Sequence, residues 1–271
     1  MSLFFQNTKN AQNSTPWLDK NIKNVNYLPD IAPWLKLVCV LNGEIRSTVD
    51  GRSLSAKSGD IIIIAPMEIH SFTSKKSEVT VINIPCSFKG EDTDLSLYTS
   101  GDVIKGGSAL NTEIRDYVSI LERELSDRVT GYTYMASGIA RVLLTSLIRS
   151  GAVKELTPDG QKKREAEAGL IKDVKKYIED NYRESVSLES ASAYCNLSLF
   201  YFSHLFKRVT DITFYDYLTA YRLDKAIEML TTENKRILEV AAECGFATVR
   251  TFNRCFKGFL NCTPSEYLSN K

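Results

Sequence analysis

The sequence predicts an α+β protein, with strands in its first third and helices in the remainder. Three observations carry this prediction: short β-prone runs up to about residue 88, two amphipathic stripes between residues 110 and 149, and a repeated helical pattern after about residue 170. Hydrophobic residues make up 43% of the 271 positions, enough to build real cores. We therefore expect a β-sandwich or barrel, then a helical hairpin, then an all-α domain.

The expected strands are bounded by turn residues. The run at 35–41 stops at Asn42-Gly43, and the run at 44–49 stops at Asp50-Gly51, a dipeptide typical of two-residue hairpins. The runs at 61–64 and 79–84 are followed by prolines. Several short strands with regular turn signals are typical of a sandwich or barrel.

Two apolar stripes predict a helical hairpin over residues 101–153. The first stripe contains Leu110, Ile114, Val118, Leu121 and Leu125, and the second contains Met135, Ile139, Val142, Leu143 and Leu147. The second helix is apolar around more than one face, so we expect the barrel or a second chain to cover part of it. Residues 154–168 are polar and contain Pro158-Asp159-Gly160, which predicts a flexible linker.

The region 169–271 contains an internal repeat. Leu188 and Ile237 are 49 residues apart, whereas Phe202 and Phe252 are 50 apart, as are residues 206 and 256 and residues 207 and 257. The offset grows by one in a turn, so each repeat is a helix, a short turn and a second helix. Asn196 and Gly245 fall in these turns, where a positive φ is often needed. A long helix at about 214–230 joins the two units.

The second helix of each unit is the expected recognition helix, because that helix enters the DNA major groove in a helix-turn-helix. The two helices span about 198–207 and 248–257, with Ser198 and Thr248 as N-caps. Residues 190–210 and 244–265 contain no Asp or Glu, which predicts surfaces that face phosphates. The residues expected to contact DNA are Phe200, Ser203, His204, Lys207, Val249, Arg250, Thr251, Asn253, Arg254 and Lys257.

A set of spaced residues in both units carries a family resemblance. In the first unit these are Ser198, Tyr201, Phe202, Ser203, Leu205-Phe206-Lys207, Phe214, Tyr217-Leu218, Arg222 and Ala226. In the second they are Ile237, Val240-Ala241, Gly245-Phe246, Phe252, Arg254, Phe256-Lys257, Thr263-Pro264 and Tyr267. Residues 170–271 thereby resemble the DNA-binding domain of the AraC/XylS family of transcription regulators. Three positions depart from the family pattern: His204 stands for the usual Arg, Asp211 for the usual Gly, and Arg250 for a common Ser.

The N-terminal strands resemble the cupin domain with which this family senses sugars or other metabolites. The resemblance is carried by Leu41-Asn42-Gly43, Gly59-Asp60, Pro66 and His70. It implies a cupin-like effector-sensing β domain at 1–100, a dimerisation hairpin at 101–153, a linker at 154–168 and a DNA-binding domain at 169–271. The residues expected to contact the effector are Tyr27, Trp34, Glu68 and His70.

The resemblance also implies a function. We expect a cytoplasmic transcription regulator, an activator, that binds double-stranded DNA, RNA polymerase and a small-molecule effector as a homodimer. We expect no membrane span, since no stretch is long and apolar enough. We expect no cofactor or metal, and we expect the six cysteines to be reduced.

Two other classes of protein are alternatives. A metal-dependent cupin enzyme would need several histidine or carboxylate ligands, but the chain has two histidines, and one of them lies in a recognition helix. A helical adaptor that binds protein would not need two recognition helices free of acidic residues. We therefore predict a DNA-binding regulator and not an enzyme.

Overall fold

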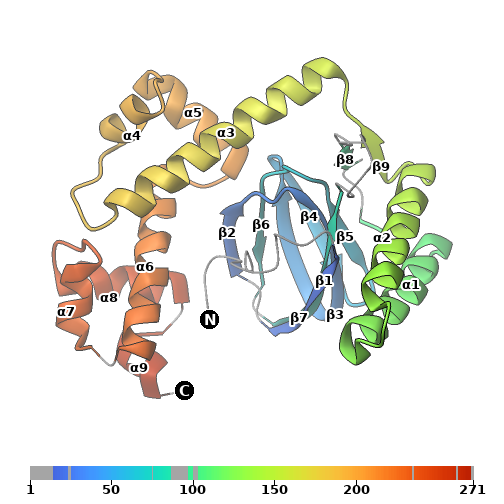
Figure 1. Ribbon diagram of the computed structural model, residues 1–271. Coiled ribbons are helices and arrows are strands. Elements are labelled where there is room, and N and C mark those ends of the chain that lie inside the picture. The colour runs from blue at the N-terminus through green and yellow to red at the C-terminus, as the bar shows by residue number, and fades with distance from the viewer. Residues whose placement is uncertain are drawn as a thin grey trace. The chain divides into compact units, whose positions relative to one another are not determined.

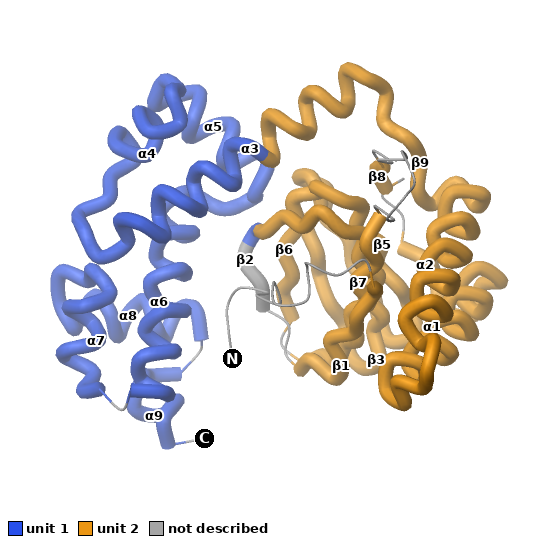
Figure 2. The backbone as a smooth tube through the Cα atoms, viewed as in Figure 1, with its two compact units in different colours: residues 1–6, 27–29, 169–271 blue, residues 7–26, 30–168 orange. Residues whose placement is uncertain are grey.

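The computed structural model describes residues 15–23, 26–74, 76–86, 97–99, 103–233, 235–260 and 262–269 (Figure 1). The chain divides into two compact units: residues 30–168 belong to one, and residues from Gly169 onward belong to the other (Figure 2). Among the described helices, none combines the length and apolar character that a membrane crossing requires. Tyr27 lies in strand β2, but its side chain is outside the described residues.

Unit 2, orange in Figure 2, is built on an antiparallel sheet of seven strands in the order β1-β7-β3-β6-β2, with β4 and β5 also paired to β3. The strands are β1 (Trp17–Lys23), β2 (Asn26–Asp30), β3 (Trp34–Val49), β4 (Arg52–Lys57), β5 (Ile61–Ile64), β6 (His70–Thr73) and β7 (Ser77–Pro85). The first half of β3 pairs with β5 and β7, and its second half pairs with β4 and β6. A separate two-stranded sheet joins β8 (Leu97–Thr99) and β9 (Val153–Glu155).

One predicted turn is confirmed and one is wrong. Asp50 and Gly51 both have positive φ, 46° and 76°, and they connect β3 to β4 as the hairpin signal indicates. Asn42 and Gly43, in contrast, lie inside β3, where the pairing with β7 shifts register. The φ of Gly43 is 79°, and a Cβ at this position would lie 2.0 Å from the carbonyl oxygen of Lys76. The glycine therefore serves a β-bulge and a close backbone approach, which a turn signal cannot distinguish from a turn.

Helices α1 (Ala109–Asp127) and α2 (Tyr132–Arg149) confirm the helical hairpin and pack on one face of the sheet (Figure 1). Their buried residues Ile114, Leu121 and Leu143 share one core with Leu37 and Ile63 of the sheet. Met135 and Val142 are 52% and 40% exposed, so their predicted place in the buried stripe is wrong. The buried line of α2 runs instead through Ala136, Ile139, Ala140, Leu143, Leu144 and Leu147. The sheet of the same chain thus covers most of the second stripe.

The prediction of a flexible linker at 154–168 is wrong. Residues 153–155 form β9, and α3 (Pro158–Asn181) begins three residues later. Proline is compatible with the first turn of a helix, because an N–H at this position has no helical partner, and Asp159 suits the positive end of the helix dipole. Arg164 fastens this helix by donating to the carboxylate of Asp50 at 2.8 Å and to the carbonyl oxygen of Leu97 at 2.8 Å.

In unit 1, blue in Figure 2, the described residues from Gly169 onward form the rest of α3 and six further helices. They are α4 (Leu188–Tyr194), α5 (Leu199–Thr210), α6 (Phe214–Thr232), α7 (Ile237–Glu243), α8 (Val249–Leu260) and α9 (Pro264–Ser269). Aromatic rings in edge and stacked contacts fill its core, among them Phe202 with Phe206 and Phe252 with Phe256. The two predicted helix-turn-helix units are α4–α5 and α7–α8, joined by the predicted long helix α6.

Candidate nucleic-acid interface and effector site

The start of each recognition helix has the predicted cap and turn. The hydroxyl of Ser198 accepts from the Tyr201 amide at 3.4 Å before α5, and the hydroxyl of Thr248 accepts from the Thr251 amide at 3.1 Å before α8. In the preceding turns, the φ angles of Asn196 and Gly245 are 55° and 76°. The two hydrogen bonds confirm the predicted N-caps, and the two φ angles confirm the predicted positive-φ positions. The caps fix the residue at which each recognition helix begins.

Buried aromatic residues decide which face of each recognition helix points outward. Phe202 and Phe206 anchor α5, and Phe252 and Phe256 anchor α8, all with almost no exposed surface. Most of the residues expected to contact DNA lie on the opposite faces. The exposed ones are Phe200, His204, Lys207, Arg250, Asn253, Arg254 and Lys257, and the half-buried ones are Ser203, Val249 and Thr251.

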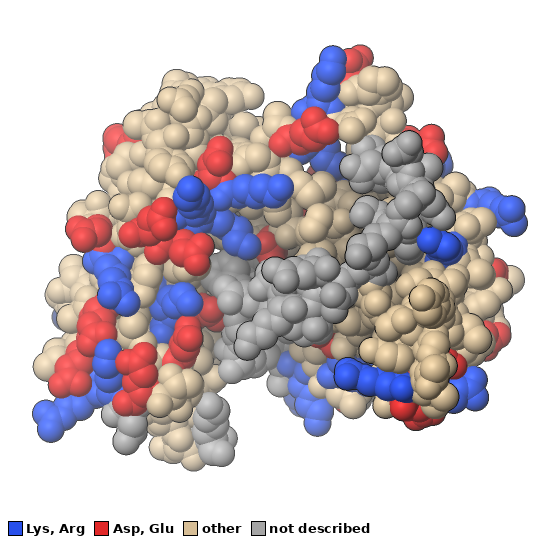
Figure 3. Space-filling view, viewed as in Figure 1, with Lys and Arg blue, Asp and Glu red and all other residues tan. Residues whose placement is uncertain are grey.

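The two outward faces differ in charge. The outward face of α8 presents Arg250, Arg254 and Lys257 without an acidic side chain in residues 244–265. The surface over α4 and α5 is mostly free of charged side chains in the view of Figure 3. Lys207 of α5 donates to the backbone carbonyl of Asp211 at the end of its own helix. Asp211 has a φ of 63°, a left-handed conformation that glycine adopts most readily at the end of a helix.

Arg222 of α6 contacts the residues that follow α3 and the turn that precedes the second recognition helix. Its Nε donates to the carbonyl oxygen of Tyr182 at 2.8 Å, and its Nη2 donates to that of Glu184 at 2.7 Å, both just after the end of α3. The guanidinium also lies over the ring of Phe246, 6.0 Å from its centroid. Arg222 therefore joins α3, α6 and the turn before α8, and it acts as a structural residue.

Trp34, Glu68 and His70, the predicted effector residues whose side chains are described, fall into two neighbouring clusters of the β domain. Trp34 packs edge-on against Trp17, with centroids 4.9 Å apart, and its Nε1 donates to Oδ1 of Asn83 at 2.9 Å. His70 lies within hydrogen-bond distance of Lys36, with 2.8 Å between Nε2 and Nζ. Trp34 and Lys36 are two residues apart on β3, so both project from the sheet face opposite to the helical hairpin.

Glu68 has a structural set of partners. It is fully buried, its carboxylate accepts from the amides of Ala65 and Thr99 at 2.8 Å each, and Nη2 of Arg164 lies 3.4 Å away. Burial raises the pKa of Glu68 above its ordinary value, and the negative charge of Asp50 adds to this, although the bonds from Thr99 and Arg164 oppose it. These contacts of the carboxylate hold β8 and α3 on the sheet. The backbone carbonyl oxygen of Glu68 lies 2.8 Å from Nδ1 of His70, so the backbone of Glu68 also orients that ring.

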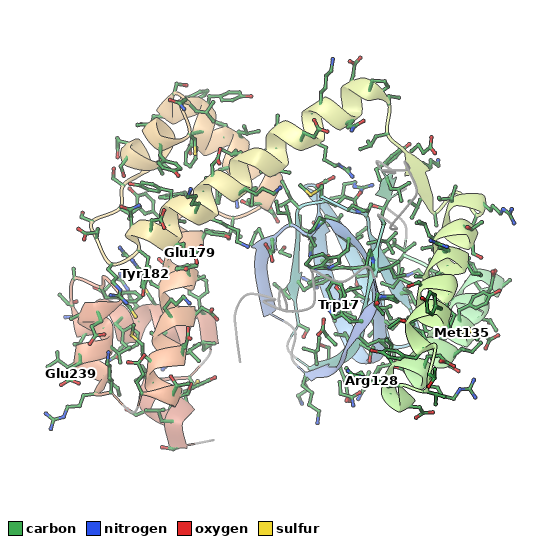
Figure 4. The ribbon with its side chains drawn as sticks, viewed as in Figure 1. Trp17, Arg128, Met135, Glu179, Tyr182 and Glu239 are labelled. Carbon is green, nitrogen blue, oxygen red and sulfur yellow. The ribbon has the colours of Figure 1, made fainter. Side chains whose placement is uncertain are left out.

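The tryptophan cluster comprises Trp17, Trp34, Lys36, His70 and Asn83, and sequence reasoning missed two of them, Lys36 and Asn83. Lys36 and Asn83 are both buried. In the sequence each is a polar residue inside an apolar strand run, and this pattern is the signal that could have pointed to them. Trp17 is 7% exposed, and its indole N–H has no hydrogen-bond partner among the described residues (Figure 4). A buried donor without a partner costs free energy unless a ligand or water satisfies it. Within the described residues there is no group of three His, Cys, Asp or Glu side chains placed to hold a metal.

Comparison with known proteins identifies the family. Residues 22–130 match the AraC-like ligand binding domain, and residues 191–270 match a helix-turn-helix domain. The Transposon Tn10 TetD protein of Escherichia coli is 38% identical over 108 residues, which are 40% of this chain and 78% of that protein. The chain belongs to the AraC/XylS family of transcription regulators.

Longer matches extend over both domains of this AraC-family protein. The HTH-type transcriptional regulator YdiP of Escherichia coli is 24% identical over 241 residues, which are 86% of this chain and 77% of that protein. The crystal structure of an apo ToxT variant from Vibrio cholerae has a TM-score of 0.52 at 14% identity and covers 94% of this chain and 97% of its own. The protein is thus a DNA-binding transcription regulator with a ligand-binding β domain, and YdiP, which matches most of its length, has the name of a regulator and not that of an enzyme.

Proposed function

We propose that this regulator recognises a specific DNA sequence with α5 and α8 in two successive segments of the major groove. The observation that carries the proposal is the outward face of α8, where Arg250, Asn253, Arg254 and Lys257 are exposed and no acidic residue lies nearby in sequence. The connecting helix α6 has 19 residues, so it is about 28 Å long at 1.5 Å per residue. That length is close to one turn of DNA, which suits two recognition helices on one face of the duplex.

The test is a salt-dependent binding measurement on Arg254→Ala. We expect Arg254→Ala to weaken binding to the preferred duplex by about 1–3 kcal/mol if Arg254 reads a base, or to reduce the salt slope by about 1 if it contacts a phosphate. Arg46→Ala is the matched control, because Arg46 is an exposed arginine on β3 in the other unit. Equal binding by wild type, Arg254→Ala and Arg46→Ala at every salt concentration would contradict the proposal.

We further propose that a small-molecule effector binds at the tryptophan cluster, with Trp34 and His70 among its contacts and Tyr27 from β2. The supporting observations are the N–H of Trp17, which has no hydrogen-bond partner among the described residues, and the buried polar groups Lys36 and His70 on the same side of the sheet. In this proposal Glu68 positions His70 and α3 and does not touch the effector.

Tryptophan fluorescence tests the effector site directly, since Trp17 and Trp34 are the two tryptophans of the chain and contact one another. Titration with a panel of sugars and other metabolites should change the emission with one ligand class and raise the melting temperature with the same ligand. Asn83→Ala should weaken that response, because it removes the acceptor that orients Trp34. A ligand that stabilises the protein without changing the emission binds elsewhere and would contradict this site.

The proposed homodimer uses the exposed face of α2. Met135, labelled in Figure 4, is 52% exposed. Tyr134 is 85% exposed, and Val142, two turns after Met135, is 40% exposed. Monomeric proteins seldom leave such a stripe uncovered. Light scattering should report a dimer for wild type and a monomer for the double variant Met135→Glu/Val142→Glu, with unchanged circular dichroism. A monomeric wild type at micromolar concentration would contradict the dimer.

Activation of transcription through RNA polymerase, in the cytoplasm where chromosomal DNA lies, is the last part of the proposal. It is supported by family membership. Transcription in vitro from a promoter that carries the selected binding site should increase when the regulator and its effector are added. A decrease would assign the protein as a repressor.

A further inference from the structure

The two recognition helices present different chemistry at equivalent positions. The offset of 50 residues that aligns Phe202 with Phe252 also aligns Phe200 with Arg250 and His204 with Arg254. Both aligned pairs are exposed on the outward face of their helix. A phenylalanine in the first unit therefore stands where an arginine stands in the second.

Phe200 lies in a run of exposed apolar residues at the start of α5. It is 75% exposed, and its neighbours Leu199 and Tyr201 are also exposed, at 42% and 54%. The ring of His204, one turn later, lies 4.3 Å from the Phe200 ring by centroid distance. We call these four residues the α5 apolar patch. Three consecutive exposed apolar side chains are more than the single scattered apolar residues that are ordinary on a protein surface, so this turn of α5 is a candidate contact surface.

The patch lies at the end of α5 that contacts bases in a helix-turn-helix. Residues at the N-terminal end of a recognition helix face the base edges, and Ser198 fixes that end of α5. No acidic residue occurs between residues 190 and 210, so nothing on this helix repels the DNA backbone. This placement favours DNA as the occupant of the patch.

The chemistry of the side chain then selects the base. Phenylalanine has neither a hydrogen-bond donor nor an acceptor, and the apolar feature of the major groove is the C5-methyl group of thymine. Arginine at the equivalent position offers paired donors that match O6 and N7 of guanine. The same docking geometry with these two side chains therefore leads to two different base preferences.

We propose that Phe200 contacts the C5-methyl group of a thymine in the first half of the binding site, at the position where Arg250 contacts guanine in the second half. The proposal rests on the proposed function, because α5 must enter the major groove. Its occupant is a thymine of duplex DNA, and a protein partner on the α5 apolar patch is the competing outcome.

The experiment removes the methyl group without removing the base. A preferred duplex is selected from a randomised pool with the wild-type chain, and each thymine is then replaced singly by deoxyuridine, which keeps the base pair. For wild type, deoxyuridine at one or two positions in one half-site should weaken binding about fourfold, the effect of burying one methyl-sized group. Phe200→Ala should bind the thymine duplex more weakly than wild type and should show no further loss with deoxyuridine at those positions.

Two control variants make the result specific. Phe200→Leu keeps an apolar side chain and should retain part of the methyl effect. Leu41→Ala removes an exposed apolar side chain from β3 in the other unit and should retain all of it. The salt slope should be the same for Phe200→Ala and wild type, since no charge changes.

Several outcomes would overturn the inference. The same loss with deoxyuridine for wild type and Phe200→Ala would show that Phe200 touches no methyl group. Unchanged binding of every duplex by Phe200→Ala would assign the patch to a protein partner. If wild type selects no sequence from the pool, the proposed function is overturned instead. If wild type selects a sequence and Arg254→Ala weakens binding or lowers the salt slope as expected, the proposed function stands even though this inference fails.

Discussion

The two helix-turn-helix units share their interiors and differ at their surfaces. Phe202 and Phe206 in one unit and Phe252 and Phe256 in the other occupy equivalent buried positions, and hydroxyl side chains cap both recognition helices. The outward faces instead carry aromatic rings on α5 and cationic side chains on α8. The buried positions are restricted by packing, whereas the exposed positions are free to specify different DNA contacts. The comparison therefore separates the residues that make the fold from those that we propose contact DNA.

Removal of the equivalent buried rings should have the largest effect. Phe202→Ala and Phe252→Ala should each lower the free energy of unfolding by about 3–5 kcal/mol, because each leaves a cavity between aromatic neighbours. Urea unfolding followed by circular dichroism measures both. A cost below about 1 kcal/mol for one variant would show that the two cores are not equivalent.

The two turns should respond differently to substitution. A Cβ at Gly245 would lie 2.5 Å from the carbonyl oxygen of Tyr182, and its φ of 76° disfavours other residues. Gly245→Ala should therefore cost about 2 kcal/mol or more. Asn196 already tolerates its φ of 55°, so Asn196→Gly should change stability by less than about 0.5 kcal/mol. Similar costs in thermal unfolding would contradict this difference between the turns.

Arg250 should give the second helix-turn-helix a preference for guanine, which Phe200 at the equivalent position of the first helix-turn-helix cannot give. Arg250→Ala should weaken binding to the preferred duplex by about 1–3 kcal/mol and relax the preference at one base pair, since a bidentate contact to guanine is lost. Selection from a randomised pool measures both effects. Uniform weakening on all sequences would indicate that Arg250 contacts phosphates only.

The caps should show the smallest difference. Thr248→Ala should cost about 1 kcal/mol, and Ser198→Ala should cost less, because its cap bond is 3.4 Å long compared with 3.1 Å for Thr248. Chemical unfolding of both variants in parallel provides the measurement. A larger cost for Ser198→Ala would mean that hydrogen-bond length does not rank these caps.

The repeat, the caps and the outward face of each recognition helix could be predicted from the sequence because each depends on local spacing. The offsets between buried aromatic residues, Ser198 and Thr248 before their helices, and the acid-free windows are all visible in the printed residues. Helical periodicity then separates the buried from the exposed face of each recognition helix. Hence the family and the helices expected to read DNA followed from the sequence.

Tertiary structure alone decided the features that depend on residues far apart in the chain. Asn42-Gly43 looks like a turn, but the backbone of Lys76 passes beside it and makes it a bulge. Pro158-Asp159-Gly160 looks like a linker, but Arg164 fastens a continuous helix to the sheet. The contact of Lys36 with His70 joins residues 34 positions apart, which no local period records. Local spacing reports which residues share a face, and only the folded chain reports what that face meets.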